Sequence, residues 1–238
     1  MTIREKILVV EDEKSISHFI CTILNSNGYE TMQFMALCIL LIACLLHRRF
    51  SFILPFGFLL SGFALLVSYL GQMNPQITPL MPVLVSPWLS IHVSLIMMSY
   101  ALLAFIMLNG ILALCLRKKE SENNVSGNDA IQDNRIEQLT LVSRLLLYPA
   151  TFFLGAGIFL GAVWANVSWG RYWAWDPKEV WALITFLVYG VAFHSQSLRI
   201  FRKPLFFHIY MILAFLTVLM TYFGVNYVLG GMHSYANA

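Results

Sequence analysis

The chain has 238 residues, of which 59% are hydrophobic and 11% charged, with a formal net charge of +3 and a mean hydropathy of +0.72. A soluble domain carries about 25% charged residues, so this composition excludes an ordinary soluble protein and predicts several membrane-spanning helices, with membrane lipid and no nucleic acid as partner. The four cysteines have no CxxC spacing, so neither a disulfide framework nor a zinc site is expected.

Residues 1–31 differ from the rest of the chain. They are charged and lack the apolar h-region of a signal peptide, so no cleavable signal peptide is expected. The run from Lys6 to Asp12, KILVVED, predicts a short strand, and an amphipathic helix pattern continues to Gly28. This part resembles the first strand and helix of a response-regulator receiver domain, in which acids matching Glu11 and Asp12 help to hold magnesium. The remainder of that fold is missing, so we expect an incomplete fragment without phosphotransfer. Either it is an accidental fusion, or the apolar run after it does not fully cross the membrane.

Six long apolar runs follow, and most approach the ~20 residues that a helix needs to cross a bilayer. They cover residues 33–46, 51–70, 89–116, 145–165, 180–198 and 204–229. The first is the weakest, and a truncated or re-entrant segment is an alternative for it. The sequence therefore predicts an all-α polytopic membrane protein with about six transmembrane helices, divided into a first half at 32–117 and a second at 145–238. The GxxxG-like spacing of Gly157 and Gly161 indicates close helix packing.

Basic residues indicate which side of the membrane each connection faces, because short cytoplasmic loops are enriched in them. Ten lie on alternate connections: Arg48, Arg49, Arg117, Lys118, Lys119, Arg135, Arg144, Arg199, Arg202 and Lys203. The polar segment 118–144 is predicted to be a cytoplasmic linker between the two halves. The connection 71–88, the loop 164–181 and the C-terminus are then expected to face outward.

The loop after the fourth run, residues 164–181, is here called the tryptophan loop. It reads WANVSWGRYWAWDPKEVW and contains five of the six tryptophans. Indoles combine a broad apolar face with an N–H donor, so this many in one boundary loop indicate a surface for a large flat ligand. The residues DPKE, from Asp176 to Glu179, fit a capping box that begins the next helix. Arg171 or Lys178 can also neutralise an anionic ligand edge.

Two histidines flank the tryptophan loop on the predicted outer side. His92 follows Ser-Pro-Trp at the start of the third run, and His233 follows the sixth run. Imidazole is the usual axial ligand of haem iron, and two imidazoles beside an indole-rich loop favour a haem site over two unrelated interfacial histidines. His194 and His208 lie in the cytoplasmic halves of the fifth and sixth runs, where an ionisable side chain is costly and indicates a function. We favour His194 over His208 as a contact for a ligand that enters from inside.

The string WGRYWAWDPKEVW, with PWLSIH before it and GGMHSYA after it, resembles the WWD signature of the CcsA-type cytochrome c biogenesis proteins. The resemblance covers about residues 33–238. It implies that the loop holds haem b on the outer face, with WWD positions at Trp169, Trp173, Trp175, Asp176 and Glu179. It also implies that His92 and His233 are the external axial ligands of the iron and that His194 belongs to an inward-facing haem site.

The resemblance further implies a subunit of a cytochrome c synthase, a haem lyase that attaches haem to the CxxCH thiols of apocytochrome c. Such a protein resides in the bacterial plasma (inner) membrane, with its haem site on the periplasmic or extracytoplasmic side, and works with a CcsB/ResB-type membrane subunit. No catalytic residue of its own is needed, because catalysis by positioning is sufficient for the addition of thiols to haem vinyl groups. The alternatives are a haem transporter or chaperone without ligase activity and, from residues 1–31 alone, a membrane-anchored signalling protein.

Overall fold

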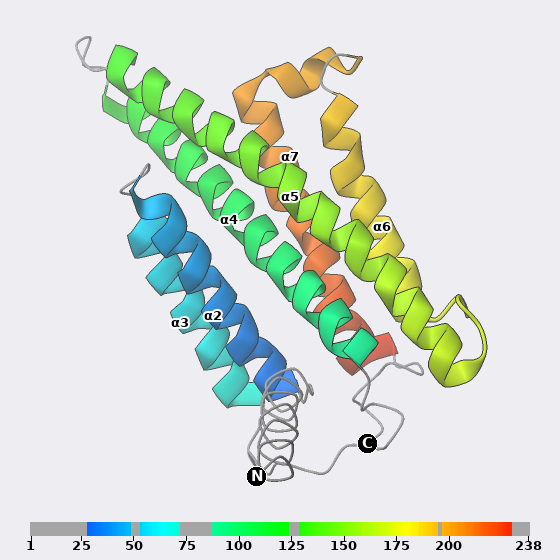
Figure 1. Cartoon of the computed structure of the whole chain (residues 1–238). Helices are drawn as coiled ribbons and strands as arrows, with labels where there is room; N and C mark the ends of the chain where they lie inside the picture. Colours follow the sequence, from blue (N-terminus) through cyan, green and yellow to red (C-terminus); the bar gives the residue numbers. More distant parts are fainter. Residues whose placement is uncertain (1–27, 49–52, 72–86, 124–128, 195–196, 230–238) are drawn as a thin grey trace, which may run out of the picture.

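The computed structural model describes residues 28–48, 53–71, 87–123, 129–194 and 197–229, and in these ranges it contains helices and no strands (Figure 1). The elements are α2 (Gly28–His47), α3 (Ile53–Gly71), α4 (Pro87–Asn123), α5 (Asp129–Trp169), α6 (Pro177–Val191), η2 (Ala192–His194), η3 (Arg199–Arg202), α7 (Pro204–Leu219) and the π-helical η4 (Met220–Leu229). The predicted all-α class is confirmed for this part of the chain. The strand predicted at Lys6–Asp12 lies outside the described residues.

Three helices are long and apolar enough to cross a membrane. They are Ile91–Arg117 with 27 residues, Asn134–Trp169 with 36 and Pro204–Val225 with 22. Two shorter apolar helices, Gln33–Leu45 and Ile53–Leu66, lie where the first two runs were predicted, and α6 has only 15 residues. The long helices indicate a membrane protein, whereas a total of six membrane-spanning helices stays a prediction.

Helix α4 lies at the centre of the bundle. It runs antiparallel to α5 and also packs against α2 and α7, while α2 pairs with α3 on one flank and α6 lies with α7 on the other (Figure 1). Residues 99–106 of α4 are all buried. Burial on every side is typical of a helix surrounded by other helices, so α4 positions the rest of the bundle.

Several buried hydroxyl and amide groups find partners within or between the described helices. Threonine hydroxyls on α5, α6, α7 and η4 donate to carbonyl oxygens three or four residues earlier, at Thr140, Thr151, Thr185, Thr217 and Thr221. Between helices, the Ser99 hydroxyl donates to the Ala150 carbonyl oxygen at 2.8 Å. The Asn109 amide donates to the Ser143 hydroxyl at 3.3 Å. These bonds allow polar side chains in apolar helices, where an unsatisfied polar group is costly.

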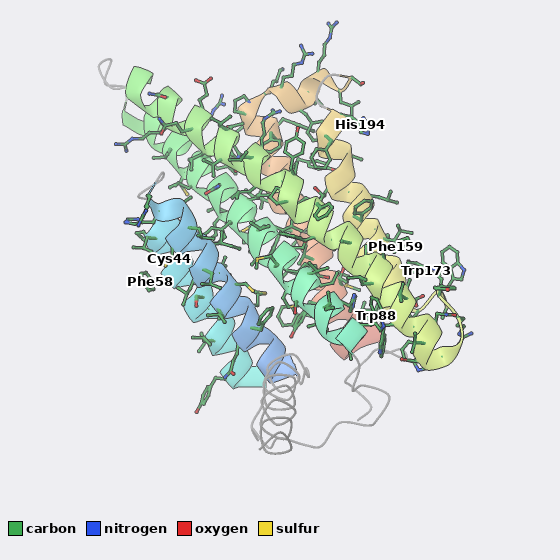
Figure 2. All side chains as sticks on the ribbon, viewed as in Figure 1. Cys44, Phe58, Trp88, Phe159, Trp173 and His194 are labelled. Carbon is green, nitrogen blue, oxygen red and sulfur yellow. The ribbon has the colours of Figure 1, made fainter. Side chains whose placement is uncertain are left out.

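The two ends of the bundle differ in chemistry. The basic end contains the end of α4, the start of α5 and η3, with exposed Arg117, Arg135, Arg199, Arg202 and Lys203. The aromatic end contains the start of α4, the end of α5 and the start of α6. Trp88 and Trp173 lie at the aromatic end, and His194 lies toward the basic end (Figure 2). The connections that carry basic residues and those that carry tryptophans thus separate as predicted, and the side that faces the cytoplasm stays a prediction.

Helical structure extends into both ends of segment 118–144, which was predicted as a linker. Helix α4 continues to Asn123 and α5 begins at Asp129. Lys, Glu, Gln and Arg, which recur in this segment, are good helix formers, and extending an existing helix requires no new nucleation. Low hydrophobicity therefore did not prevent helix formation here. Helix α2 likewise begins at Gly28, four residues before the predicted boundary at residue 32.

Candidate functional site

His92 lies in the second turn of α4 and is half-buried against α5. Its Nδ1 atom is 2.6 Å from the carbonyl oxygen of Gly157. A carbonyl oxygen can only accept, so Nδ1 is the protonated donor, and the lone pair of the neutral ring is on Nε2. Metal-ligating histidines commonly donate through one ring nitrogen to a backbone carbonyl in the same way, which fixes the orientation of the ring.

Two glycines of α5 make room for this arrangement. A Cβ atom at Gly161 would lie 2.7 Å from Cε1 and 2.8 Å from Nδ1 of His92, and a Cβ atom at Gly157 would lie 2.6 Å from Cδ1 of Ile96. Real Cβ atoms essentially never come so close to other atoms. The GxxxG-like spacing therefore does mark close helix packing, as predicted, and it also seats the His92 ring on the α5 surface.

Helix α5 ends in a glycine cap at the start of the exposed part of the tryptophan loop. Gly170 has φ +73°, and its N–H donates to the carbonyl oxygen of Asn166 at 2.9 Å. Glycine adopts this left-handed conformation at little cost, which makes it a common helix terminator. Just before it, the indoles of Trp164 and Trp169 pack edge to face, with centroids 4.8 Å apart. The chain thus leaves α5 in a fixed direction.

The other end of the loop is a capping box, as the sequence predicted. The Asp176 carboxylate accepts from the Lys178 N–H at 3.2 Å. The Glu179 Oε2 atom accepts from the N–H of Asp176 at 3.2 Å and from the N–H of Ala174 at 2.8 Å. Asp176 is buried, with 6% of its surface exposed. These bonds satisfy backbone donors at the start of α6 and hold the loop against it.

Between these two caps, the loop exposes its aromatic side chains. Trp175 has φ +59°, a conformation that costs roughly 1–2 kcal/mol for a residue other than glycine. Its side chain is 72% exposed, and its ring meets that of Trp173 edge to face at a centroid distance of 6.0 Å. Tyr172 beside them is also exposed. A strained backbone that holds a large exposed indole is typical of a binding surface.

Two cationic side chains accompany this aromatic surface. Arg171 is exposed, and Lys178 is half-buried ahead of the apolar run that begins at Val180. Desolvation lowers the pKa of Lys178 from 10.5 to about 8, although the carboxylate of Asp176 opposes this shift. The ammonium group therefore stays mainly protonated at neutral pH, where it can attract an anion.

The structure brings only part of the predicted site together. The loop residues and His92 lie at the aromatic end, separated along α5 by the eight helical steps from Gly161 to Trp169, or about 12 Å. His194 is exposed toward the basic end, so it does not share their site (Figure 2). His233 lies outside the described residues, so its pairing with His92 stays a prediction.

His208 is fully buried between α7 and α5. Its Nε2 atom is 2.9 Å from the Thr140 hydroxyl oxygen, and that hydroxyl donates to the Ile136 carbonyl oxygen at 2.8 Å. With the hydroxyl proton directed to Ile136, the bond between the two side chains is donated by Nε2 of His208. His208 thus links two helices in the described structure, away from the aromatic end.

Sequence reasoning missed three features of the site. They are the Gly157 carbonyl as the partner of His92, the second bond of Glu179 to Ala174, and the left-handed backbone of Trp175. The GxxxG spacing was the only signal for the first, and it did not indicate which residue packs on the glycines. The sequence contains no comparable signal for the other two.

A family model described as cytochrome C assembly protein matches residues 25–233. The chain is 39% identical over 211 residues to the protein NrfI of Wolinella succinogenes, covering 89% of the chain and 23% of that protein. It is 37% identical over 240 residues to the cytochrome c biogenesis protein CcsA of Chlamydomonas reinhardtii, covering 96% of the chain and 64% of that protein. The chain is 34% identical over 231 residues to CcsA of Guillardia theta, covering 88% of the chain and 75% of that protein. The chain thus spans less than two thirds of the first two relatives, and most of residues 1–31 lie outside the family match.

Proposed function

Because the chain belongs to the cytochrome c assembly protein family, we propose that it holds haem at the aromatic end and presents it for attachment to apocytochrome c. The supporting observation is the His92 ring, whose Nδ1 donates to the Gly157 carbonyl, so that in the neutral ring the lone pair is on Nε2. This is the protonation state that an axial ligand of iron needs.

The residues of the aromatic end fit a haem group in three ways. His92 would hold the iron through Nε2, and His233 is proposed as a second ligand. The exposed indole of Trp175 and the half-buried indole of Trp173 offer apolar surface to the macrocycle. Arg171 and Lys178 supply positive charge for the propionates.

Attachment requires little chemistry from the chain itself. Haem supplies the iron and the vinyl groups, and the CxxCH motif of the substrate supplies the thiols. The chain binds and orients, and holding reactants in place can lower a barrier by roughly 7–11 kcal/mol in favourable cases. Trp169, Asp176 and Glu179 would contribute by fixing the loop, since each lies at one of its two caps.

The surroundings of the site are proposed from the distribution of charge. Six membrane-spanning helices would place the basic end in the cytoplasm and the aromatic end on the periplasmic or extracytoplasmic side of a bacterial inner membrane. A CcsB/ResB-type subunit is proposed as the partner, with His194 at an inward-facing haem site. Residues 1–31 are proposed to be an incomplete receiver-like fragment that acetyl phosphate does not label.

The proposal is tested by haem spectroscopy on protein purified from a haem-sufficient host. Wild type should show a Soret band that shifts or disappears when His92 and His233 are both replaced by alanine, because the iron loses its axial ligands. His47→Ala is the matched control, since His47 is an exposed histidine at the last residue of α2. Identical spectra for wild type and the double variant would contradict the ligand assignment.

A second experiment separates the synthase from the transporter or chaperone. The chain is coexpressed with an apocytochrome c and a CcsB/ResB-type subunit, and the substrate is examined on denaturing gels. Haem that stays on the substrate after denaturation supports thioether formation. Haem that remains bound to the chain while the substrate stays unmodified supports a carrier.

A further inference from the structure

The carboxylate of Glu179 holds the two backbone N–H groups on either side of Trp175. A single oxygen, Oε2, accepts from Ala174 at 2.8 Å and from Asp176 at 3.2 Å. We infer that Glu179 is a positioning residue that sets the backbone conformation of Trp175 and thereby directs its indole. This deepens the proposed function and rests on it only for the identity of the ligand that meets the indole.

The geometry explains the left-handed backbone of Trp175. Two N–H groups two residues apart converge on one acceptor when the chain between them turns through a left-handed conformation, which forms a small anion-binding concavity. Trp175 has φ +59° at this position. Bulky residues rarely adopt such values, so a partner must hold it there. In this protein the anion in the concavity is the chain's own carboxylate, and hydrogen bonds to a charged acceptor are strong.

The same carboxylate connects the indole to a rigid element. Glu179 lies in the first turn of α6, so the direction of Trp175 follows the helix and not only the loop. The indole is 72% exposed and meets Trp173 edge to face. Binding groups held by rigid elements keep their geometry better than groups on unsupported loops. Loss of the Glu179 contact should therefore turn the indole away from its present orientation.

Only one of the two carboxylate oxygens of Glu179 accepts the N–H bonds, so positioning by hydrogen bonds can be tested separately from the effect of the negative charge. Both N–H groups bond to Oε2, so the single carbonyl oxygen of a glutamine can replace it at the same reach. An aspartate keeps the charge but is shorter by one methylene group and cannot reach both N–H groups. Glu179→Gln and Glu179→Asp therefore form a matched pair with opposite expectations.

The direct test uses protein labelled with 5-fluorotryptophan, purified without haem and studied by fluorine NMR. The Trp175 resonance is assigned by its loss in Trp175→Phe. We expect E179Q to keep this resonance near its wild-type position and E179D to shift and narrow it, with the Trp88 resonance unchanged as an internal control. A Trp175 resonance that is unaffected in E179D, or that moves as far in E179Q as in E179D, overturns the inference. Aspartate and glutamine are both accepted in the first turn of a helix, so both variants should fold.

Haem titration then connects the contact to binding. E179D should weaken haem binding by roughly tenfold, as loss of a supporting contact commonly does, and E179Q should weaken it less. If E179Q weakens binding as much as E179D, the charge acts and the positioning role is refuted. If wild type binds no haem, the proposed function fails, while the fluorine resonance still decides the role of Glu179.

Discussion

The two nitrogens of His92 have different roles because one backbone carbonyl lies beside the ring. The 2.6 Å contact with Gly157 fixes the proton on Nδ1 and the orientation of the imidazole. At the other side of the site, Glu179 fixes the backbone of Trp175 through a pair of N–H groups. In both cases the proposed ligand contact, His92 or Trp175, is held in place by a neighbour that would not itself touch the ligand, Gly157 or Glu179. Residues of this second kind are as important to the site as those that touch the ligand.

The pKa of Lys178 predicts how haem binding depends on pH. The ammonium loses its proton as pH rises through about 8, so attraction for the propionates is lost over the same range. We expect haem affinity to fall by roughly fivefold, or about 1 kcal/mol, between pH 7 and pH 9.5. Lys178→Arg stays charged and should remove this dependence. A wild-type affinity that is constant over this range would contradict the prediction.

Without haem, the stability should depend on pH in the opposite direction. The folded pKa of Lys178, about 8, lies below its ordinary value of 10.5. Between these values the unfolded chain binds more protons, so the stability of the folded state rises with pH across this window. The desolvation cost is fully present below pH 8. Thermal unfolding in detergent at a series of pH values measures this effect, and Lys178→Met should abolish it.

Helices α4 and α5 approach each other closely at two glycines of α5. Gly157 and Gly161 face Ile96 and His92, which are also four residues apart on α4. A helix repeats its faces at this spacing, so two glycines on one helix accommodate two side chains on the other. The contact that joins the helices therefore also orients the proposed ligand.

Gly161→Ala tests this double role of the contact. The new Cβ atom would lie 2.7 Å from the His92 ring, so the ring or the helix must shift and the bond to Gly157 must weaken. We expect a loss of about 1–3 kcal/mol in unfolding free energy together with a changed haem spectrum. Gly62→Ala on α3 is the matched control, because a Cβ atom there would have no neighbour within 4 Å. Equal effects of the two substitutions would show that the position of Gly161 has no special role.

The hydrogen bond between α5 and α7 gives a second prediction for the helices. Thr140→Val removes the hydroxyl that His208 Nε2 contacts at 2.9 Å, whereas Thr140→Ser keeps it. Interhelical hydrogen bonds in membranes contribute about 0.6 kcal/mol on average and up to roughly 1.7 kcal/mol, so the free energy of unfolding of the valine variant should fall by an amount in this range. Unfolding in mixed micelles measures this free energy. A serine variant as unstable as the valine variant would point to lost packing instead.

At the scale of the whole molecule, the proposed orientation places the basic end in the cytoplasm and the aromatic end on the outer side of the membrane. Tyr172 is 60% exposed at the aromatic end and Leu198 is 42% exposed near the basic end. In a background without native cysteines, Tyr172→Cys should react with a membrane-impermeant thiol reagent added to intact cells. Leu198→Cys should react only after lysis. The reverse pattern would invert the orientation and place the proposed haem site on the cytoplasmic side.

The sequence predicted best what is decided by neighbouring residues. The capping box could be predicted because its acceptors and donors lie within four residues, from Asp176 to Glu179. The His92 contact joins residues 65 positions apart, so it depends on how α4 is aligned with α5, which no local pattern specifies. Helix formation within 118–144 was missed for a different reason, since a hydrophobicity pattern does not register polar residues that extend an existing helix.

The loop between α5 and α6 has both of its ends fixed before any ligand arrives, by Gly170 on one side and by Asp176 with Glu179 on the other. Association with a flat partner would then require little additional ordering of the chain, and ordering is one of the main entropic penalties of complex formation. Binding of a flat ligand should accordingly occur on a preformed surface. Calorimetry should then show only a small entropy loss from ordering of the loop.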